Sequence, residues 1–141
     1  MEIKNLRYGN DYPSQCPPAD CYQVENKKMY RVCSKEILNK NNNLNMENFI
    51  PVWEDKKRRF PKKKRCEAKA LSFFLTKEDC LSIISDFPKI GNKIIEVTIN
   101  KKCGYLKKTA NRENHYSLWD LSTPTISQAV GNNWELVYEK K

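Results

Sequence analysis

The clearest hydrophobic pattern lies in the middle of the chain, where an apolar run of strand length is followed by a helical pattern. Residues 70–75 form a dense apolar run. Thr76 then stands at a helix N-cap position, acidic residues occupy the first turn, and apolar residues recur at helical spacing until Pro88. The pattern predicts a buried strand and, after it, one principal helix over 76–87.

Alternation of apolar and polar residues with a period of two predicts further strands before and after this unit. Residues 28–33, 93–99 and 134–139 each fit such a strand. A polar turn over 100–104 follows the second of these. We therefore expect 105–109 to pair back on 93–99 as a hairpin.

The remaining segments are dominated by turn-forming residues. Residues 1–26 predict an irregular N-terminal arm. Asn45 can cap a short helix near 46–50, which Pro51 ends. Together the elements predict a single α+β domain over 27–141, in which a mainly antiparallel sheet of about five strands is backed by the principal helix.

One decapeptide, residues 56–65, carries nearly all of the excess charge. The chain holds 26 Lys and Arg against 17 Asp and Glu, a net charge of +9. Eight of these ten residues are basic, and without them 18 basic residues face 17 acidic ones. Pro61 argues against a continuous helix here, so we expect an exposed basic loop. Its basic residues are Lys56, Lys57, Arg58, Arg59, Lys62, Lys63, Lys64 and Arg65.

So dense a cluster of cations needs an anionic partner. Binding to a phosphate backbone relieves the repulsion between the cations and releases counterions, and Trp53 and Phe60 can each stack on an unpaired base. The leading hypothesis is a non-enzymatic accessory protein that binds nucleic acid or a nucleoprotein complex through the basic loop. Small bacterial proteins of this kind often act beside a larger protein partner, for instance in defence against phage.

Three alternatives to nucleic-acid binding stay open for the basic loop. It can be a solvated segment that aids solubility, or a nuclear localisation signal in a eukaryotic host. It can also belong to a protein–protein adaptor, in which the loop meets an acidic partner.

The composition also bears on compartment and assembly. Residues 1–10 lack the apolar segment of a signal peptide, and no run approaches the roughly 18 apolar residues of a membrane span. We therefore expect a soluble cytoplasmic protein without a membrane partner, whose six cysteines are reduced thiols. The strand over 134–139, if it lies at a sheet edge, can pair across the axis of a homodimer.

Metal and cofactor chemistry is not indicated. The chain contains no Cys-x-x-Cys pair and only one histidine, His115. A structural zinc site usually requires two close pairs of ligands, and only Cys16 and Cys21 come near that spacing. The sequence predicts neither a metal site nor a cofactor.

Few residues carry a catalytic signature. His115 lies beside acidic and hydroxyl residues and can serve as a general base, but no nucleophile motif accompanies it. We expect it to be hydrogen-bonded within a loop. Arg31 stands inside an apolar strand, where a guanidinium needs a carboxylate or a ligand phosphate. Glu96, on a neighbouring predicted strand, is the expected salt-bridge partner.

Four short motifs carry a resemblance to other sequences. They are Cys16-Pro17-Pro18-Ala19-Asp20, Tyr30-Arg31, Cys66-Glu67-Ala68-Lys69-Ala70-Leu71-Ser72-Phe73, and His115 with Tyr116 and Trp119. In this order of motifs the chain resembles a loose set of short, uncharacterised bacterial proteins. The resemblance implies no activity.

A second similarity concerns the layout of elements alone. The sequence places Arg31 on one predicted strand and Ser72 on a later strand that precedes a helix. This order of elements is similar to the layout of ADP-ribosyltransferases. For the catalytic Glu of that family, Glu113 and Glu135 are the candidates, and neither stands in a convincing motif. The similarity implies, as an alternative, a small NAD-dependent transferase with Arg31, Ser72 and His115 as its catalytic residues.

Overall fold

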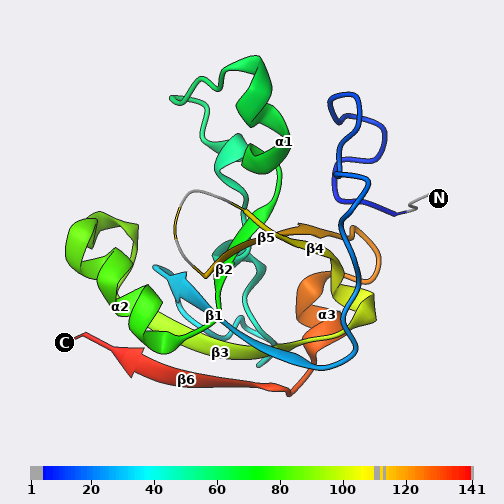
Figure 1. Ribbon diagram of the computed structural model, residues 1–141. Coiled ribbons are helices and arrows are strands. Elements are labelled where there is room, and N and C mark those ends of the chain that lie inside the picture. The colour runs from blue at the N-terminus through cyan, green and yellow to red at the C-terminus, as the bar shows by residue number, and fades with distance from the viewer. Residues whose placement is uncertain (1–4, 110–111, 113, 141) are drawn as a thin grey trace.

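The computed structural model describes residues 5–109, 112 and 114–140. In this part of the chain six strands form one antiparallel sheet, in the order β4-β5-β2-β1-β3-β6 (Figure 1). The predicted α+β class with a mainly antiparallel sheet is therefore confirmed. The strands are β1 (Lys27–Cys33), β2 (Leu71–Phe74), β3 (Lys93–Ile99), β4 (Gly104–Lys108), β5 (His115–Asp120) and β6 (Trp134–Glu139).

Short helical elements connect and cover the strands. The α-helices are α1 (Arg65–Ala68), α2 (Lys77–Asp86) and α3 (Ile126–Val130). The 3-10 turns are η1 (Met46–Asn48), η2 (Val52–Glu54), η3 (Lys62–Lys64), η4 (Pro88–Ile90) and η5 (Lys101–Cys103). No helix among the described residues is long and apolar enough to cross a membrane.

The principal helix α2 lies against one face of the sheet, as its sequence predicts. Thr76 is the N-cap, and its hydroxyl accepts a hydrogen bond from the backbone N–H of Asp79 at 3.1 Å. The buried side chains of Ile83 and Ile84 pack with Phe74 of β2. Apolar helical spacing therefore placed this element correctly, because a single buried face accounts for its pattern.

The opposite face of the sheet holds the larger core. Phe73 of β2, Ile95 of β3 and Leu118 of β5 lie here with Phe49 and with Ile126 of α3. Each of these side chains is essentially inaccessible to solvent. The two faces of the sheet are thus covered by different elements, α2 on one side and the segment around Phe49 with α3 on the other (Figure 1).

The predicted hairpin between 93–99 and 105–109 is wrong. β4 pairs instead with β5 at the far edge of the sheet, and β5, β2 and β1 separate it from β3. Gly104 starts β4 with a φ of 133°, and a Cβ atom there would lie 2.2 Å from the backbone oxygen of Trp119. Glycine thus allows β4 to approach β5 closely at this point. Turn spacing in the sequence did not identify β5 as the partner strand, because this contact joins residues that are not neighbours in the turn.

Strand β5 was not predicted, and His115 lies on it rather than in a loop. Five of the six β5 side chains are buried, and four of these, Ser117 to Asp120, follow one another. A strand buried on both faces shows no alternation of apolar and polar residues. For that reason the segment looked irregular in the sequence.

The predicted helix near 46–50 is a single 3-10 turn, η1. The side chain of Asn45 caps it by accepting a hydrogen bond from the N–H of Glu47 at 3.0 Å, as expected of an N-cap. Residues 56–65 form no continuous helix: η3 begins after Pro61, and α1 begins at Arg65. The helix-breaking effect of Pro61 was thus interpreted correctly.

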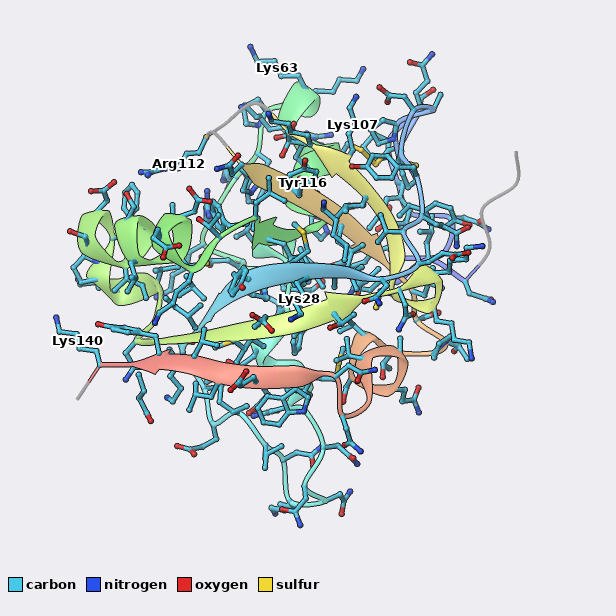
Figure 2. All side chains as sticks on the ribbon, turned by 60° about the horizontal axis from the view of Figure 1, so that its bottom comes forward. Lys28, Lys63, Lys107, Arg112, Tyr116 and Lys140 are labelled. Carbon is cyan, nitrogen blue, oxygen red and sulfur yellow. A yellow bond between two sulfur atoms is a disulfide. The ribbon has the colours of Figure 1, made fainter. Side chains whose placement is uncertain are left out.

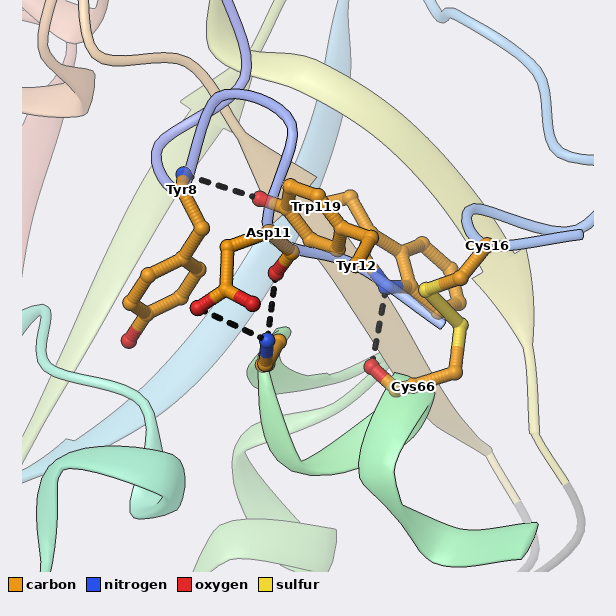
Figure 3. Close-up of a disulfide and its surroundings, with 7 residues drawn as sticks. Tyr8, Asp11, Tyr12, Cys16, Cys66 and Trp119 are labelled. Carbon is orange, nitrogen blue, oxygen red and sulfur yellow. Dashed lines mark hydrogen bonds and ion pairs between the residues drawn. A yellow bond between two sulfur atoms is a disulfide. The ribbon is translucent and has the colours of Figure 1, made fainter. Parts of the chain in front are cut away.

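The described part of the N-terminal segment, residues 5–26, forms isolated bridges to the sheet, one of them between Leu6 and Leu121. A disulfide joins Cys16 to Cys66 (Figure 3). The expectation that all six cysteines are reduced thiols is therefore wrong for this pair. The two residues are 50 positions apart, and only the packing of the segment against α1 brings them together. The four free cysteines are Cys21, Cys33, Cys80 and Cys103, all buried.

Candidate polyanion-binding segment and adjoining cleft

The basic residues predicted from the sequence occupy a projecting segment, residues 56–65, which we call the basic lobe. In Figure 1 the lobe and α1 stand at the top, beyond the sheet, and Figure 2 shows Lys63 pointing away from it. All eight basic side chains are exposed. Among the described residues none of the eight forms an ion pair with a carboxylate. The lobe is therefore a concentrated and uncompensated positive surface.

Trp53 and Phe60, the two aromatic residues predicted to stack on bases, stack on each other in this structure. The ring centroids of Trp53 and Phe60 are 5.9 Å apart and the rings are inclined by 30°. The guanidinium of Arg58 lies over the Phe60 ring at 5.0 Å, and the Nε of Arg65 donates to the Phe60 carbonyl at 3.4 Å. Both rings thus serve to pack the lobe in this conformation.

A buried lysine, Lys69, holds the base of the lobe. Its side chain is only 3% exposed. Its ammonium lies 4.4 Å from the ring centroid of Trp53 and about as close to two further rings, at 5.4 Å for Tyr8 and 5.5 Å for Tyr12. It donates to the backbone oxygen of Asp11 and lies 3.4 Å from the carboxylate of the same residue. Together with the Cys16–Cys66 disulfide, these contacts tie the lobe to the N-terminal segment.

A second contact ties the N-terminal segment to the sheet. The guanidinium of Arg7 forms an ion pair with Asp120 on β5, with an Nη2–Oδ2 distance of 2.7 Å. The same Nη2 also donates to the backbone oxygen of Phe49 at 2.5 Å. Asp120 is completely buried, and burial raises its pKa while Arg7 opposes that change. The position of the lobe is therefore supported by a buried ion pair as well as by Lys69.

Beside the lobe lies a cleft of about 550 Å³, bounded by β1, β2, the segment around Asn48 and the end of α2. Its rim carries several exposed apolar side chains. Four of the seven large hydrophobic side chains that are exposed in the described residues line it, namely Ile50, Val52, Phe87 and Ile90. Three guanidinium groups line the same cleft, those of Arg31, Arg58 and Arg112. Because Arg58 belongs to the basic lobe, the two features adjoin.

The three arginines of the cleft differ in their contacts. Arg112 is paired with Asp86, with an Nη2–Oδ2 distance of 2.9 Å, and stacks over Phe87. Arg58 contacts the Phe60 ring and has no ion-pair partner among the described residues. Arg58 is thus the guanidinium with the most freedom to meet an anion in the cleft.

The predicted salt bridge between Arg31 and Glu96 is wrong. Tyr30 stands directly opposite Glu96 in the β1–β3 register, and its hydroxyl donates to the Glu96 carboxylate at 2.6 Å. Arg31 is the next residue and points to the other face, because side chains alternate along a strand. Its Nε donates to the Asn48 carbonyl at 2.8 Å and its Nη1 to the Ser72 carbonyl at 2.7 Å. Backbone oxygens, not a carboxylate, satisfy this guanidinium.

His115 lies in a chain of hydrogen-bonded side chains that begins at the cleft. Its Nε2 is 3.0 Å from the hydroxyl oxygen of Ser72, and its Nδ1 is 2.6 Å from that of Thr109. The Thr109 hydroxyl lies in turn 3.1 Å from that of Ser117. Burial lowers the pKa of His115, which favours the neutral imidazole. Arg31, Ser72 and His115, three residues singled out from the sequence, therefore meet in one cleft.

Thr109 completes this arrangement, and nothing in the sequence pointed to it. The neighbouring thiol of the cleft, Cys33, is 1% exposed, and burial raises its pKa to about 11. Cys33 is therefore protonated at neutral pH and poorly placed for nucleophilic attack. Ser72, whose side chain is exposed within an otherwise buried strand, is an accessible hydroxyl of the cleft and is the one that contacts His115.

The third element of the ADP-ribosyltransferase layout does not join the other two. Glu135 lies on β6 and lines a different depression, together with Tyr30 and Glu96. Glu113 lies outside the described residues. Among the residues that line the cleft and are described, the only carboxylate is that of Glu47.

Metal ligands are likewise not gathered anywhere in the described chain, since no three His, Cys, Asp or Glu side chains are close enough to hold an ion.

No family model, no curated protein and no solved structure matches the sequence or the fold.

Proposed function

We propose that the protein binds nucleic acid, alone or within a nucleoprotein complex, by contacting the phosphate backbone with the basic lobe. The observation that carries the proposal is the environment of the eight lobe cations, which are exposed and lack carboxylate partners among the described residues. Other exposed lysines, such as Lys35 and Lys89, also lack such partners among the described residues, but they are scattered along the chain, whereas the eight lobe cations stand within ten residues.

The physical basis is electrostatic. Eight like charges within ten residues repel one another, and a polyanion removes that repulsion while it releases its own condensed counterions. If about five of the cations contact phosphates, the logarithm of the affinity should fall with the logarithm of salt concentration with a slope of about −4 to −5. Contacts of this kind position a protein on nucleic acid but read no base sequence.

An acidic protein partner is less well supported by the composition of the lobe. Stable protein interfaces centre on buried apolar or aromatic side chains. The one aromatic residue within the lobe, Phe60, is half-buried and covered by Arg58. Apart from Pro61, the remaining exposed groups of the lobe are ammonium and guanidinium heads, which match a row of phosphates better than a mixed protein surface.

The test compares two variants with the same net charge. In the lobe variant all eight basic residues of the lobe become Gln. In the control variant Gln replaces eight exposed lysines elsewhere, namely Lys28, Lys35, Lys40, Lys89, Lys101, Lys102, Lys108 and Lys140. Fluorescence anisotropy with labelled single-stranded and duplex oligonucleotides measures the affinity.

We expect the lobe variant to lose affinity by a factor of about 100 or more, and the control variant to change much less. Equal losses in both variants would attribute binding to net charge rather than to the lobe. Unchanged affinity in the lobe variant would contradict the proposal outright. An acidic protein that still binds the lobe after nuclease treatment, in the absence of oligonucleotide binding, would support the adaptor hypothesis instead.

A further inference from the structure

The cleft beside the lobe contains an arrangement that nucleic-acid binding does not use. We propose that Ser72 and His115 form a catalytic nucleophile–base pair that hydrolyses carboxylic esters, with Thr109 as the positioning residue for the histidine. The inference is independent of the proposed function, because it concerns the strands beneath the lobe. It rests on hydrogen-bond geometry, on the exposure of Ser72 and on the lining of the cleft.

The sheet register places nucleophile and base together. β2 and β5 are antiparallel neighbours in which Ser72 pairs with Ser117 and Phe74 pairs with His115. Ser72 and His115 therefore lie on the same face as diagonal neighbours, close enough for direct contact. The 3.0 Å distance between Ser72 Oγ and His115 Nε2 is within the range required for proton transfer from a serine to a base.

The second nitrogen of the imidazole is also held. With the proton on Nδ1, His115 donates to the Thr109 hydroxyl, and the lone pair of Nε2 faces Ser72. The Thr109 hydroxyl can then donate to Ser117 at 3.1 Å. The ring of Phe74 fixes the plane of the imidazole by an edge contact, with centroids 5.2 Å apart. A nucleophile, a base and a third group that orients the base are the parts of a hydrolytic triad, here with a neutral third member.

The charge near Ser72 favours an ester over a phosphate ester as substrate. Arg31 is fixed close by, because its Nη1 donates to the Ser72 carbonyl. Its Nε donates to the Asn48 carbonyl, so two of its five N–H groups are used within the fold and the guanidinium is held as one fixed positive charge. The guanidinium packs over Phe73, on the sheet face opposite to the Ser72 hydroxyl, so its charge acts through its field in the cleft and not by a direct hydrogen bond. One such charge suits the single negative charge of the tetrahedral intermediate in acyl transfer.

The rim of the cleft indicates what else the substrate carries. Ile50, Phe87 and Ile90 expose apolar surface around the opening, which suits an apolar acyl or aryl group. Arg58 lines the same cleft without an ion-pair partner among the described residues. The best substrate is therefore an ester with an apolar part and an anionic group, such as a carboxylate, at the end that reaches Arg58.

The reaction balances with water as the only co-reactant. Ser72 Oγ attacks the ester carbonyl carbon while its proton moves to His115 Nε2. The bond from carbon to the leaving oxygen breaks, and the leaving alcohol takes that proton. Water then attacks the acyl-serine and transfers a proton to His115. The bond between the carbon and Ser72 Oγ breaks, Ser72 takes the proton back from His115, and the carboxylic acid is released.

An alkyl fluorophosphonate provides the first test, because it modifies serines that have an activating base. We expect one adduct on the folded protein by intact mass, located at Ser72 by peptide mapping. Ser34, which lines the same cleft, should stay unmodified because the one histidine of the chain bonds to Ser72. Neutral and carboxylate-bearing p-nitrophenyl esters provide the second test.

Ser72→Ala should lower ester hydrolysis by a factor of about 100 or more, while Ser82→Ala, an exposed site on α2, should not change it. Thr109→Val should lower the plateau of the rate at an unchanged KM. It should also lower the pH at which the rate reaches half that plateau, because an acceptor at Nδ1 favours the protonated imidazole. The lobe variant should lose its preference for the carboxylate-bearing ester but keep the fluorophosphonate adduct, which separates this proposal from nucleic-acid binding. A folded wild-type protein that forms no adduct at Ser72, or that hydrolyses both esters no faster than Ser72→Ala, would overturn the inference.

Discussion

The lysines of the basic lobe and Lys69 lie within one short stretch of chain, yet they meet opposite environments. Lys63 is exposed and has no carboxylate partner among the described residues. Lys69 is buried, faces the aromatic rings of Tyr8, Tyr12 and Trp53, and donates to Asp11. The first kind of lysine leaves its charge available to a ligand, and the second uses its charge to hold the fold.

The difference comes from where the partners originate. Three of the groups around Lys69 belong to the N-terminal segment, far from Lys69 in sequence, and they arrive there through the same packing that joins Cys16 to Cys66. The lobe lysines project beyond the reach of that segment. A cation is thus structural only where the fold supplies acceptors and rings, and a run of basic residues does not by itself tell which members will be structural.

Removal of Arg7 should have the largest effect on stability. Arg7→Met leaves the carboxylate of Asp120 completely buried without its cationic partner, and the free energy of unfolding should fall by about 3–5 kcal/mol in urea titrations. Lys101→Met is the matched control, because it removes a cation whose partner, Glu25, is almost fully exposed. This control should show no measurable loss. Similar losses in the two variants would mean that the Arg7–Asp120 contact does not stabilise the arrangement of the N-terminal segment.

Two single substitutions should separate the structural lysine from the binding lysines. Lys69→Met loses the contacts to three rings and to Asp11, so the free energy of unfolding should fall by about 1–3 kcal/mol, while the salt dependence of oligonucleotide binding stays the same. Lys63→Met should do the reverse. Its stability should change by less than about 0.5 kcal/mol, and the slope against salt should shrink by about 1. A lobe lysine that affected only stability would contradict the division between the two regions.

The smallest expected effect is a pH dependence of stability that originates at His115. Burial lowers its pKa in the folded protein below the ordinary value of 6.5, and the charge of Glu67 opposes this. The unfolded chain therefore binds a proton more readily, so the contribution is fully present above pH 6.5 and is lost as pH falls below that value.

Urea titrations of the wild type and His115→Asn at several pH values between 5 and 8 isolate this contribution, because all other titrating groups are shared. The wild type should lose more stability than the variant as pH falls. Parallel pH profiles would show that the imidazole is not buried in the neutral form. Such a result would also weaken the assignment of His115 as a base.

Helix α2 and strand β3 could be predicted because their patterns depend on one neighbouring face. Thr76 caps α2 at the expected residue, and β3 spans the expected range. Strand β5 could not be predicted, because it is covered on both faces and carries two polar side chains, His115 and Ser117, that both bond to Thr109. Local periodicity reports burial on one side only.

The candidate site divides in the same way. The cations of the basic lobe could be identified from their spacing, and Arg31, Ser72 and His115 were each noticed in the sequence. Their meeting in one cleft depends on the strand order, which places β2 between β1 and β5. Thr109 was missed because its role exists only through its 2.6 Å contact to the imidazole.

By itself, the sequence determined where charge accumulates and which short segments can form a helix or a strand, since both follow from neighbouring residues. The tertiary structure alone decided that β4 pairs with β5, that Arg31 bonds to backbone oxygens rather than to Glu96, and that Cys16 meets Cys66. Each of these depends on contacts between residues far apart in the chain. Such contacts form only when a whole sheet is assembled, because each strand finds its partner through the core that all the strands bury together.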